Sequence, residues 1–491
     1  MQGQTITRQT WLCIALIAAA GLAARVLAFA PFDISHADEL MQYLEQGKRL
    51  ATGHGIVPWE YRYGARNELL PQLLAVPFWL GAKLAPGTLA GMLAARWMFL
   101  ATTLLALPAA WRLGALTSRL HALAALFVGA VWYENVLFST LLLSEVLAAA
   151  LIAMAAALLL ADAPSRAALR WAGLLLGLGI IVRLQYAPFA AVLALARLRF
   201  DWRAWRDLAL GGLAALAIGA LSDLAAGQVP LRWIWVNLAY NMGQGRAARF
   251  GAAGPFEYGR LLLDHLGPAA SLILAGALLS PARYRPLVLA LAANLLFHSL
   301  IAHKEYRFVW LSVWSITVLA AIASVSLAQA LAARRGRALS LPLLGLLGML
   351  WLGASFAAQA QSGGARTLRG GAPIPLAANA AAARKETCGI ALPNQWRAHL
   401  VPALLPRAVP LYIAPAGVMG QGQPLPHGLV QAADVLIFPQ LPNGAPNGVL
   451  GYQALTCRAN TVLKACVYVR LGGCHPDPDW TYQAALERED L

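Results

Sequence analysis

The chain has 491 residues, of which 59% are hydrophobic and only 12% are charged, and its formal net charge is +16. An average soluble domain carries roughly 25% charged residues, so this composition excludes an ordinary soluble protein and indicates one built for lipid. The positive charge does not indicate a nucleic-acid partner, because the arginines stand in short clusters between apolar runs, where they serve as topology signals.

Apolar runs of roughly 18 or more residues recur through the first 358 positions and are typical of membrane-spanning helices. The first run is longer than the apolar part of a signal peptide and precedes no clear cleavage site, so we expect it to be retained. We therefore predict a polytopic α-helical membrane protein with about eleven spans. The expected spans are 11–30, 88–111, 120–138, 141–160, 171–183, 185–198, 207–226, 259–279, 286–302, 308–330 and 339–358.

Several clusters of basic residues at the ends of these runs fall on one side of the membrane in this assignment. By the positive-inside rule that side is the cytoplasm, so eleven crossings place residues 360–491 on the periplasmic side of an inner membrane. The residues concerned are Arg8, Arg112, Arg119, Arg166, Arg170, Arg197, Arg199, Arg203, Arg206, Arg283, Arg285, Arg334, Arg335 and Arg337.

Two apolar regions do not suit full spans. Prolines, a glutamine and a lysine interrupt 66–84, which we place as an interfacial or re-entrant segment of a first outer loop, 31–87. The stretch 171–198 is too short for two spans of about 20 residues. We expect two short helices that meet near Arg183 in a hairpin below the outer surface, leaving a cavity there.

The first outer loop is acidic: residues 31–70 hold six of the chain's 22 acidic residues. Asp38, Gln42, Glu45 and Arg49 are spaced for one face of a helix, with apolar side chains opposite. Such a helix, lying along the membrane surface, can direct a carboxylate base toward a lipid-facing cavity. The alternative is a solvated amphipathic helix with an ordinary cap.

A second polar group, His303-Lys304-Glu305-Tyr306-Arg307, lies between two apolar runs with almost no loop. Ionisable groups at a membrane boundary are costly unless they are paired or line a polar cavity. Lys304 and Arg307 can converge on one anion, since the planar arginine fork suits phosphate, and Glu305 can hold a cation in place. The alternative is an outer cap of snorkelling side chains.

Further polar groups lie within or beside the spans. Glu145, Arg183 and Gln185 are expected toward the same outer side as the first loop, where they could line one pocket, whereas Arg96 is not. Each could equally be a contact between packed helices.

The C-terminal part is predicted to be a small α/β domain, 385–491, which follows a linker, 359–384. Short β-prone runs alternate here with a helical stretch, 395–405. The domain has no glycine-rich phosphate loop or nucleophile motif, so we assign it no chemistry. It could cap the membrane domain, 1–358, help to hold an acceptor, or be purely structural. The β-prone runs are Gly389–Leu392, Leu411–Ala414, Asp434–Phe438 and Ala465–Leu471.

Four of the five cysteines, Cys388, Cys457, Cys466 and Cys474, fall in this domain. An even set fits an oxidising compartment and up to two disulfides, in any of three pairings. A zinc site is the alternative, but no Cys-x-x-Cys spacing exists and Cys474-His475 is a weak indication.

The polar motifs of the first outer loop and of residues 303–308 resemble those of a known family. His36-Ala37-Asp38-Glu39, with the residues that follow it, resembles the first luminal loop of the Alg9-like, glycosyltransferase family 22 mannosyltransferases, and His303–Phe308 resembles their His-Lys-Glu-x-Arg-Phe signature. The resemblance covers roughly 1–358. Ala37, Pro58 and Asn67 depart from the usual proline, threonine and serine. The other matching residues of the first loop are Gln42, Tyr43, Leu44, Glu45, Gly53, His54, Gly55, Trp59, Glu60 and Arg66.

The resemblance implies a membrane domain of the GT-C type and an inverting transfer of a sugar, expected to be mannose, from a polyprenyl-phosphate carrier to a glycan or glycolipid acceptor. Asp38 is then the general base, with Glu39 the alternative. The implied donor-phosphate ligands are His303, Lys304, Arg307 and Arg183. The implied substrate-binding residues are His36, Gln42, Glu60, Arg66, Glu145 and Glu305.

The implied mechanism requires Asp38 and the Lys304–Arg307 cations to act in one cavity on the periplasmic side. A lipid-linked donor needs neither a nucleotide-binding domain nor an Asp-x-Asp metal motif, and neither motif is found, so no metal or other cofactor is expected. The expected partners are the lipid-linked donor, the acceptor and membrane lipids. The competing function is a lipid or glycan transporter, which would favour internal repeats that the sequence lacks.

Overall fold

The computed structural model describes residues 7–363, 368–393, 398–415, 424–439 and 451–489. The chain forms two compact units, each built from two separate stretches of sequence. Unit 1 comprises Met1–Phe29 and Phe99–Ala365, and unit 2 comprises Ala30–Met98 and Arg366–Leu491. The first outer loop and the C-terminal part of the chain therefore belong to the same unit.

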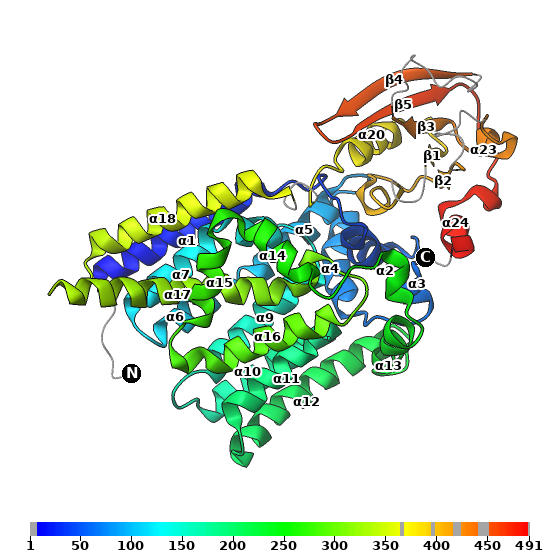
Figure 1. Ribbon diagram of the computed structural model, residues 1–491. Coiled ribbons are helices and arrows are strands. Elements are labelled where there is room, and N and C mark those ends of the chain that lie inside the picture. The colour runs from blue at the N-terminus through cyan, green and yellow to red at the C-terminus, as the bar shows by residue number, and fades with distance from the viewer. Residues whose placement is uncertain (1–6, 364–367, 394–397, 416–423, 440–450, 490–491) are drawn as a thin grey trace. The chain divides into compact units, whose positions relative to one another are not determined.

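In its described residues, unit 1 is helical throughout (Figure 1). The helix α17 is largely enclosed by its neighbours, whereas the apolar faces of α1 and α18 are mostly exposed, as expected for helices that contact lipid. The helices are α1 (Arg8–Ala28), α5 (Ala90–Thr103, which begins in unit 2), α6 (Ala106–Ala115), α7 (Arg119–Val131), α8 (Tyr133–Ser139), α9 (Ser144–Leu159), α10 (Arg166–Val182), α11 (Ala187–Leu198), α12 (Trp202–Ala225), α13 (Arg232–Leu238), α14 (Glu257–Leu266), α15 (Ala270–Leu278), α16 (Arg285–Ser299), α17 (Trp310–Arg334) and α18 (Leu341–Gln361).

Fewer helices than expected have the length of a full membrane span. Among the described residues, six are long and apolar enough to cross a membrane, or seven if the bent pair α7 and α8 counts as one. The expected count of eleven is not confirmed, because several apolar runs form helices of only 10–17 residues, such as α9. The protein is a helical membrane protein with six or seven candidate spans.

The stretch 171–198 differs from the expected hairpin. A single 3-10 turn, Leu184–Tyr186, joins α10 to α11, but the two helices do not pack along each other. Instead α10 packs on α9 and α12, while α11 packs on α16. Pro188 lies in the first turn of α11, directly after the 3-10 turn. The chain changes direction there, and α11 packs against helices other than α10.

Unit 2 combines short helices of the first outer loop with a five-stranded sheet. The strand order is β2-β1-β3-β5-β4, in which β1 pairs in parallel with β2 and β3, and β5 pairs antiparallel with β3 and β4. Its elements are a π-helix (Glu39–Leu44), α2 (Glu45–Thr52), α3 (Trp59–Arg62), α4 (Leu69–Leu84), α20 (Pro373–Ala382), α23 (His427–Ala432), α24 (Tyr482–Glu489), β1 (Ile390–Leu392), β2 (Leu411–Ile413), β3 (Val435–Phe438), β4 (Tyr452–Ala459) and β5 (Lys464–Arg470).

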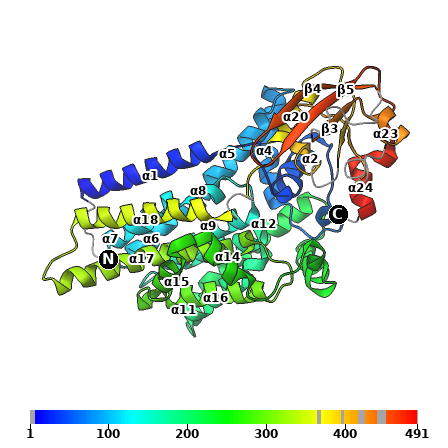
Figure 2. The same ribbon diagram turned by 45° about the horizontal axis from the view of Figure 1, so that its top comes forward.

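The sheet confirms the small C-terminal α/β domain. The helix α20 packs against β4 and β5, as Figure 2 shows, although it lies in the stretch expected as a linker. Residues 395–397 of the predicted helix 395–405 lie outside the described part of the chain; Ala398 is helical, and a 3-10 turn, Pro402–Leu404, follows. The strand β4 is also additional to the predicted runs.

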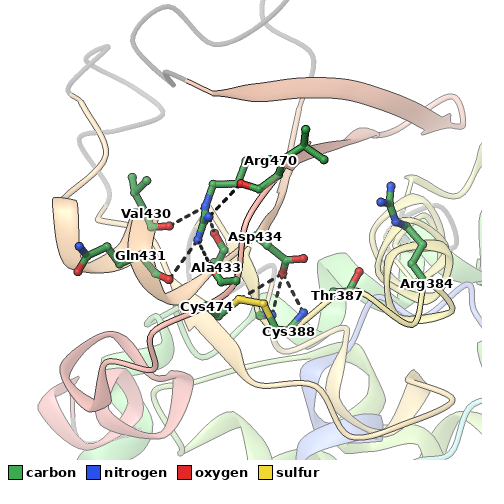
Figure 3. The surroundings of a disulfide bond; sticks show 12 residues. Arg384, Thr387, Cys388, Val430, Gln431, Ala433, Asp434, Arg470 and Cys474 are labelled. Atoms are coloured by element: carbon green, nitrogen blue, oxygen red, sulfur yellow. Dashed lines mark hydrogen bonds between the residues drawn. A yellow bond between two sulfur atoms is a disulfide. The ribbon is translucent and has the colours of Figure 1, made fainter.

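The four C-terminal cysteines form two disulfides, Cys388–Cys474 and Cys457–Cys466. The structure thus has one of the three possible pairings. The cysteine sulfurs that a zinc site would have used are bonded to each other instead. Asp434 secures the first disulfide, because its carboxylate accepts hydrogen bonds from the backbone N–H groups of Cys388 and Gly389, at 3.0 and 2.9 Å (Figure 3).

Candidate functional site

In unit 1, two arginines from distant parts of the sequence share one buried carboxylate. Arg183 follows the last residue of α10, and Arg307 lies in the 3-10 turn that precedes α17. A nitrogen of each guanidinium lies 3.3 Å from the same oxygen of Glu145, in the first turn of α9. Each guanidinium also lies 5.0 Å from the centre of the Phe308 ring, within reach of a cation–π interaction.

Glu305 adds a second carboxylate to this group. It accepts two hydrogen bonds from Arg307, at 2.6 and 3.1 Å, in the bidentate arrangement that a guanidinium favours. His303 Nε2 lies 2.9 Å from the same carboxylate. Glu305 therefore joins the histidine and the arginine of the signature, and Arg307 is held on two sides.

Lys304 faces a different neighbour. Its amino group donates hydrogen bonds to the backbone oxygens of Ala253 and Ile301, at 3.1 and 2.5 Å. His303 Nδ1 lies 3.2 Å from the backbone oxygen of Gly251. The loop before α14 thus lies along the signature, and Lys304 is only partly buried, so its charge can be shared with an anion.

A further buried cluster, which was not predicted from the sequence, packs against Tyr306 of the signature. Glu134 in α8 is fully buried and lies 3.0 Å from Nδ1 of His265 in α14. The His265 ring is stacked on the ring of Tyr306 with 3.5 Å between their centres. The sequence indicates this cluster only through one acidic residue, Glu134, in the apolar run 120–138. Its role could not be predicted, because its partner His265 is distant in the sequence.

In unit 2, the two candidate bases have different surroundings. Glu39 is fully buried and its carboxylate forms an ion pair with the buried Arg96, at 3.3 Å. Asp38 is only partly buried. A general base must reach the proton that it removes. Of the two carboxylates, Asp38 is the more accessible, whereas Glu39 is held by Arg96.

The expected substrate-binding residues of the first loop lie together around Asp38. Gln42 donates a hydrogen bond of 2.6 Å to the buried carboxylate of Glu60, and Arg66 donates one of 3.1 Å to the hydroxyl of Tyr43. Burial raises the pKa of Glu60, the positive charge of Arg66 opposes this rise, and the charge of Asp38 adds to it. These pKa effects place Asp38, Glu60 and Arg66 within electrostatic range of one another.

The helix that carries Asp38 is not the solvated amphipathic helix that the sequence suggested. Glu39–Leu44 form a π-helix, and every side chain from Glu39 to Gly47 is buried. The reason is that C-terminal residues cover it, as described below. A π-helical turn inside a helix is frequently found at functional sites. His36 lies just before it, and its backbone oxygen accepts the N–H of Glu39.

The sequence-predicted residues thus form two groups, one in each unit. Unit 1 holds Glu145, Arg183, His303, Lys304, Glu305 and Arg307, and unit 2 holds His36, Asp38, Glu39, Gln42, Glu60 and Arg66. Arg96, which was expected apart from the outer polar residues, lies in unit 2 beside Glu39.

Comparison with solved structures finds a similar fold in several proteins. ArnT from Cupriavidus metallidurans bound to undecaprenyl phosphate has a TM-score of 0.59 and 14% identity, over 96% of this chain and 100% of that one. The same protein in the apo state has a TM-score of 0.59 and 15% identity, over 94% and 99%. The Archaeoglobus fulgidus oligosaccharyltransferase, in complex with Zn and sulfate, has a TM-score of 0.53 and 14% identity, over 80% of this chain and 61% of that one.

At these identities the likeness shows the fold alone, and no curated protein sequence gives a significant match to the chain. The sequence itself, however, matches a family model from residue 16 to residue 371, which includes both polar motifs. The chain therefore belongs to the Alg9-like mannosyltransferase family.

Proposed function

We propose that this membrane glycosyltransferase moves a sugar, mannose, from a polyprenyl-phosphate carrier to a hydroxyl group of a glycan or glycolipid acceptor. Family membership supports the transfer of a mannose. The similar fold of a protein whose structure contains undecaprenyl phosphate supports a polyprenyl carrier. The acceptor is proposed only as a class.

The observation that carries this proposal is the pair of arginines around Glu145. The negative charges of Glu145 and Glu305 balance those of Arg183 and Arg307. Lys304 of the same signature, which donates to backbone oxygens, adds a further positive charge. A sugar phosphodiester carries about one negative charge, and the departing polyprenyl phosphate gains a second. Fixed cations at that position stabilise the transition state more than the ground state.

The proposed reaction is a single displacement. The Asp38 carboxylate accepts the proton of the acceptor hydroxyl, whose oxygen attacks the anomeric carbon on the face opposite the phosphate. The bond between that carbon and the phosphate oxygen breaks, and polyprenyl phosphate leaves with the bonding electrons. The configuration at the anomeric carbon is inverted. His36, Gln42, Glu60 and Arg66 are proposed to shape the acceptor side, and His303 to bond the phosphate.

We also propose that the reaction takes place on the periplasmic side of an inner membrane. The basic loops, expected in the cytoplasm, contact one another in unit 1: Arg283 forms an ion pair with Asp162, and Arg197 donates to the backbone oxygen of Ala161. Arg170, near the start of α10, pairs with Asp207, near the start of α12. These contacts support a common side for the basic loops, as the positive-inside rule requires.

The test is sugar transfer by the purified protein, with undecaprenyl phosphate that carries radiolabelled mannose and a total lipid extract of the source membranes as acceptor. We expect Asp38→Asn to reduce the rate about 100- to 10,000-fold, because general-base catalysis typically contributes 10²–10⁴-fold. Lys304→Gln should reduce it about 10–100-fold through loss of one phosphate contact.

The matched controls are Asp479→Asn and Lys385→Gln, which change exposed residues of the same types. Both should transfer sugar at the wild-type rate. Transfer that survives both Asp38→Asn and Lys304→Gln would contradict the proposed mechanism. Movement of the labelled lipid across vesicle membranes without any transfer would instead favour a transporter.

A further inference from the structure

The C-terminal domain places two buried aromatic side chains beside the helix that carries Asp38. Tyr482 is the first residue of α24, and its hydroxyl forms a hydrogen bond with Nδ1 of His399. The same hydroxyl lies 3.6 Å from the sulfur of Met41, in the π-helix that begins one residue after Asp38. His399 and Tyr482 are exposed by only 7% and 1%, so neither is a surface residue.

Other contacts fix this part of the C-terminal domain against the first loop. The side-chain amide of Gln483 bonds both backbone groups of Val57, at 3.0 and 3.3 Å. Lys48 donates to the backbone oxygen of Pro402, at 3.2 Å. On the other side of Asp38, the Asp33 carboxylate accepts the backbone N–H of Gly370, at 2.7 Å. The loop is therefore anchored to the domain on both sides of the proposed base.

Through Tyr482, which contacts both His399 and Met41, the imidazole lies beside the helical turn that follows Asp38. Burial lowers the pKa of His399 to about 4, while the negative charge of Asp38 acts in the opposite direction. The imidazole is therefore neutral at physiological pH and has one N–H donor and one acceptor nitrogen. The charged and titratable groups that face it are Asp38 and Tyr482, and Tyr482 in turn lies within range of Glu45.

We propose that His399, oriented by Tyr482, is a positioning residue for the Asp38 carboxylate. When the tyrosine hydroxyl donates to Nδ1, the proton of the neutral ring is on Nε2, where it can be donated to a carboxylate. Such a donor favours the ionised form of the acid and fixes its direction. This inference rests on the proposed role of Asp38 as general base, and it gives the C-terminal domain a part in the reaction.

The experiment compares His399→Leu, His399→Gln and Tyr482→Phe with the wild type in the transfer assay, across a range of pH. The side-chain amide of the glutamine variant would return an N–H near the position of Nε2, whereas leucine would not. We expect His399→Leu to lower kcat at least about tenfold with KM for the donor lipid changed less than about twofold. Tyr482→Phe should give a smaller loss.

The pH profile separates positioning from mere packing. Without the donor, the ionised base is less favoured, so the acidic limb of the kcat profile of His399→Leu should move to higher pH. His399→Gln should restore most of kcat and the wild-type limb. The matched control His427→Leu changes an exposed histidine of the same domain and should leave both unchanged.

An unmoved acidic limb, a loss confined to KM, or a failure of His399→Gln to restore kcat would each overturn the positioning role. Wild-type transfer by Asp38→Asn would instead remove the proposed base, whatever the histidine variants show. Loss of transfer in Asp38→Asn together with wild-type kinetics in His399→Leu would leave the proposed function intact and reject only this inference.

Discussion

Glu145 shows at the residue scale how one buried carboxylate can organise two cations. Arg183 and Arg307 belong to segments more than 100 residues apart, and both bond the same oxygen. Guanidinium groups repel each other, so without the carboxylate their buried positions would be unfavourable. Removing one partner from a buried ion pair typically costs about 3–5 kcal/mol.

We therefore expect Glu145→Gln to lower both the thermal unfolding midpoint and the rate of sugar transfer, the latter at least about tenfold. Scanning fluorimetry and the transfer assay measure the two effects. Glu386→Gln, at a carboxylate that is 75% exposed, is the matched control and should behave as the wild type. Unchanged stability and rate in Glu145→Gln would mean that the arginines hold their positions without a shared anion.

His399 gives a prediction about stability that does not depend on catalysis. Its pKa falls from 6.5 to about 4 on folding, so below about pH 6.5 the unfolded chain binds a proton that the folded chain does not. Stability is therefore lost as the pH falls from about 6.5 toward 4, by up to about 3 kcal/mol. His399→Leu should lack this loss.

The measurement is the unfolding midpoint of both proteins between about pH 7 and pH 4.5. Burial also raises the pKa of Glu45 and Glu60, which stabilises the folded state on acidification, but both proteins share this effect. The difference between them therefore reports the histidine, together with any change in the ionisation of Asp38 that follows from its loss. Parallel pH curves for the two proteins would show that His399 does not have the lowered pKa.

At the scale of single elements, the break between α7 and α8 explains a buried arginine that the sequence did not reveal. The two helices meet at an angle of 57° around Trp132, so carbonyl groups near the break lose their helical partners. Arg25 of α1 donates hydrogen bonds to the backbone oxygens of Gly129, Ala130 and Asn135, at 2.7–3.2 Å. An intramembrane charge is tolerated here because it serves these carbonyls.

Arg25→Met keeps the apolar length of this side chain and removes its donors. Each buried carbonyl left without a partner costs about 1–3 kcal/mol, so we expect a marked fall in the unfolding midpoint, with Arg25→Lys intermediate. The exposed Arg337 provides the control variant Arg337→Met. A midpoint for Arg25→Met equal to that of Arg337→Met would show that water or backbone rearrangement satisfies the break.

The elements also show which features could be predicted from the sequence. Apolar runs predicted most helices of unit 1, because burial in lipid leaves a continuous local signature. The signature 303–308 and the acidic loop drew attention to polar residues that the structure assembles within one unit each. That both motifs act in one cavity stays a prediction. The span count, the π-helix and the bend between α7 and α8 could not be predicted, because they depend on which neighbours satisfy each backbone group.

The same limit applies to partners that are distant in the sequence. Nothing local marks His265 as the partner of Glu134, or Tyr482 as the partner of His399. The disulfide pairing likewise required the strand register, in which Cys457 lies opposite Cys466. In each case the missing information was a tertiary contact, and an isolated polar residue in an apolar or loop sequence was its only trace.

At the scale of the whole molecule, the C-terminal domain matters because it forms one unit with the loop that carries Asp38. Residues 30–98 leave the first helix and fold with residues 366–491, so the proposed base is supported by a domain that follows it by more than 300 residues. A loop of this kind, if it were held only by its own sequence, would have few buried contacts. Its anchoring explains how polar side chains such as Glu60 can be buried there.

The membrane orientation of unit 1 can be tested by cysteine labelling of the whole protein. Ala163 lies in the basic loop before α10, which contains Asp162, the ion-pair partner of Arg283. Ala252 lies in the loop before α14, beside the His303 and Lys304 contacts. Both alanines are exposed, so both suit replacement by cysteine in a Cys13→Ser background.

Because arginine-rich loops remain in the cytoplasm, we expect a membrane-impermeant maleimide to label Ala252→Cys in intact cells and to label Ala163→Cys only after the membrane is permeabilised. The two native disulfides do not react with maleimide, so the signal reports the introduced thiol. The reverse pattern would place the cations proposed to bind the phosphate on the cytoplasmic side. Sugar transfer at the periplasmic face would then be impossible, even if every catalytic assignment made from the two motifs were correct.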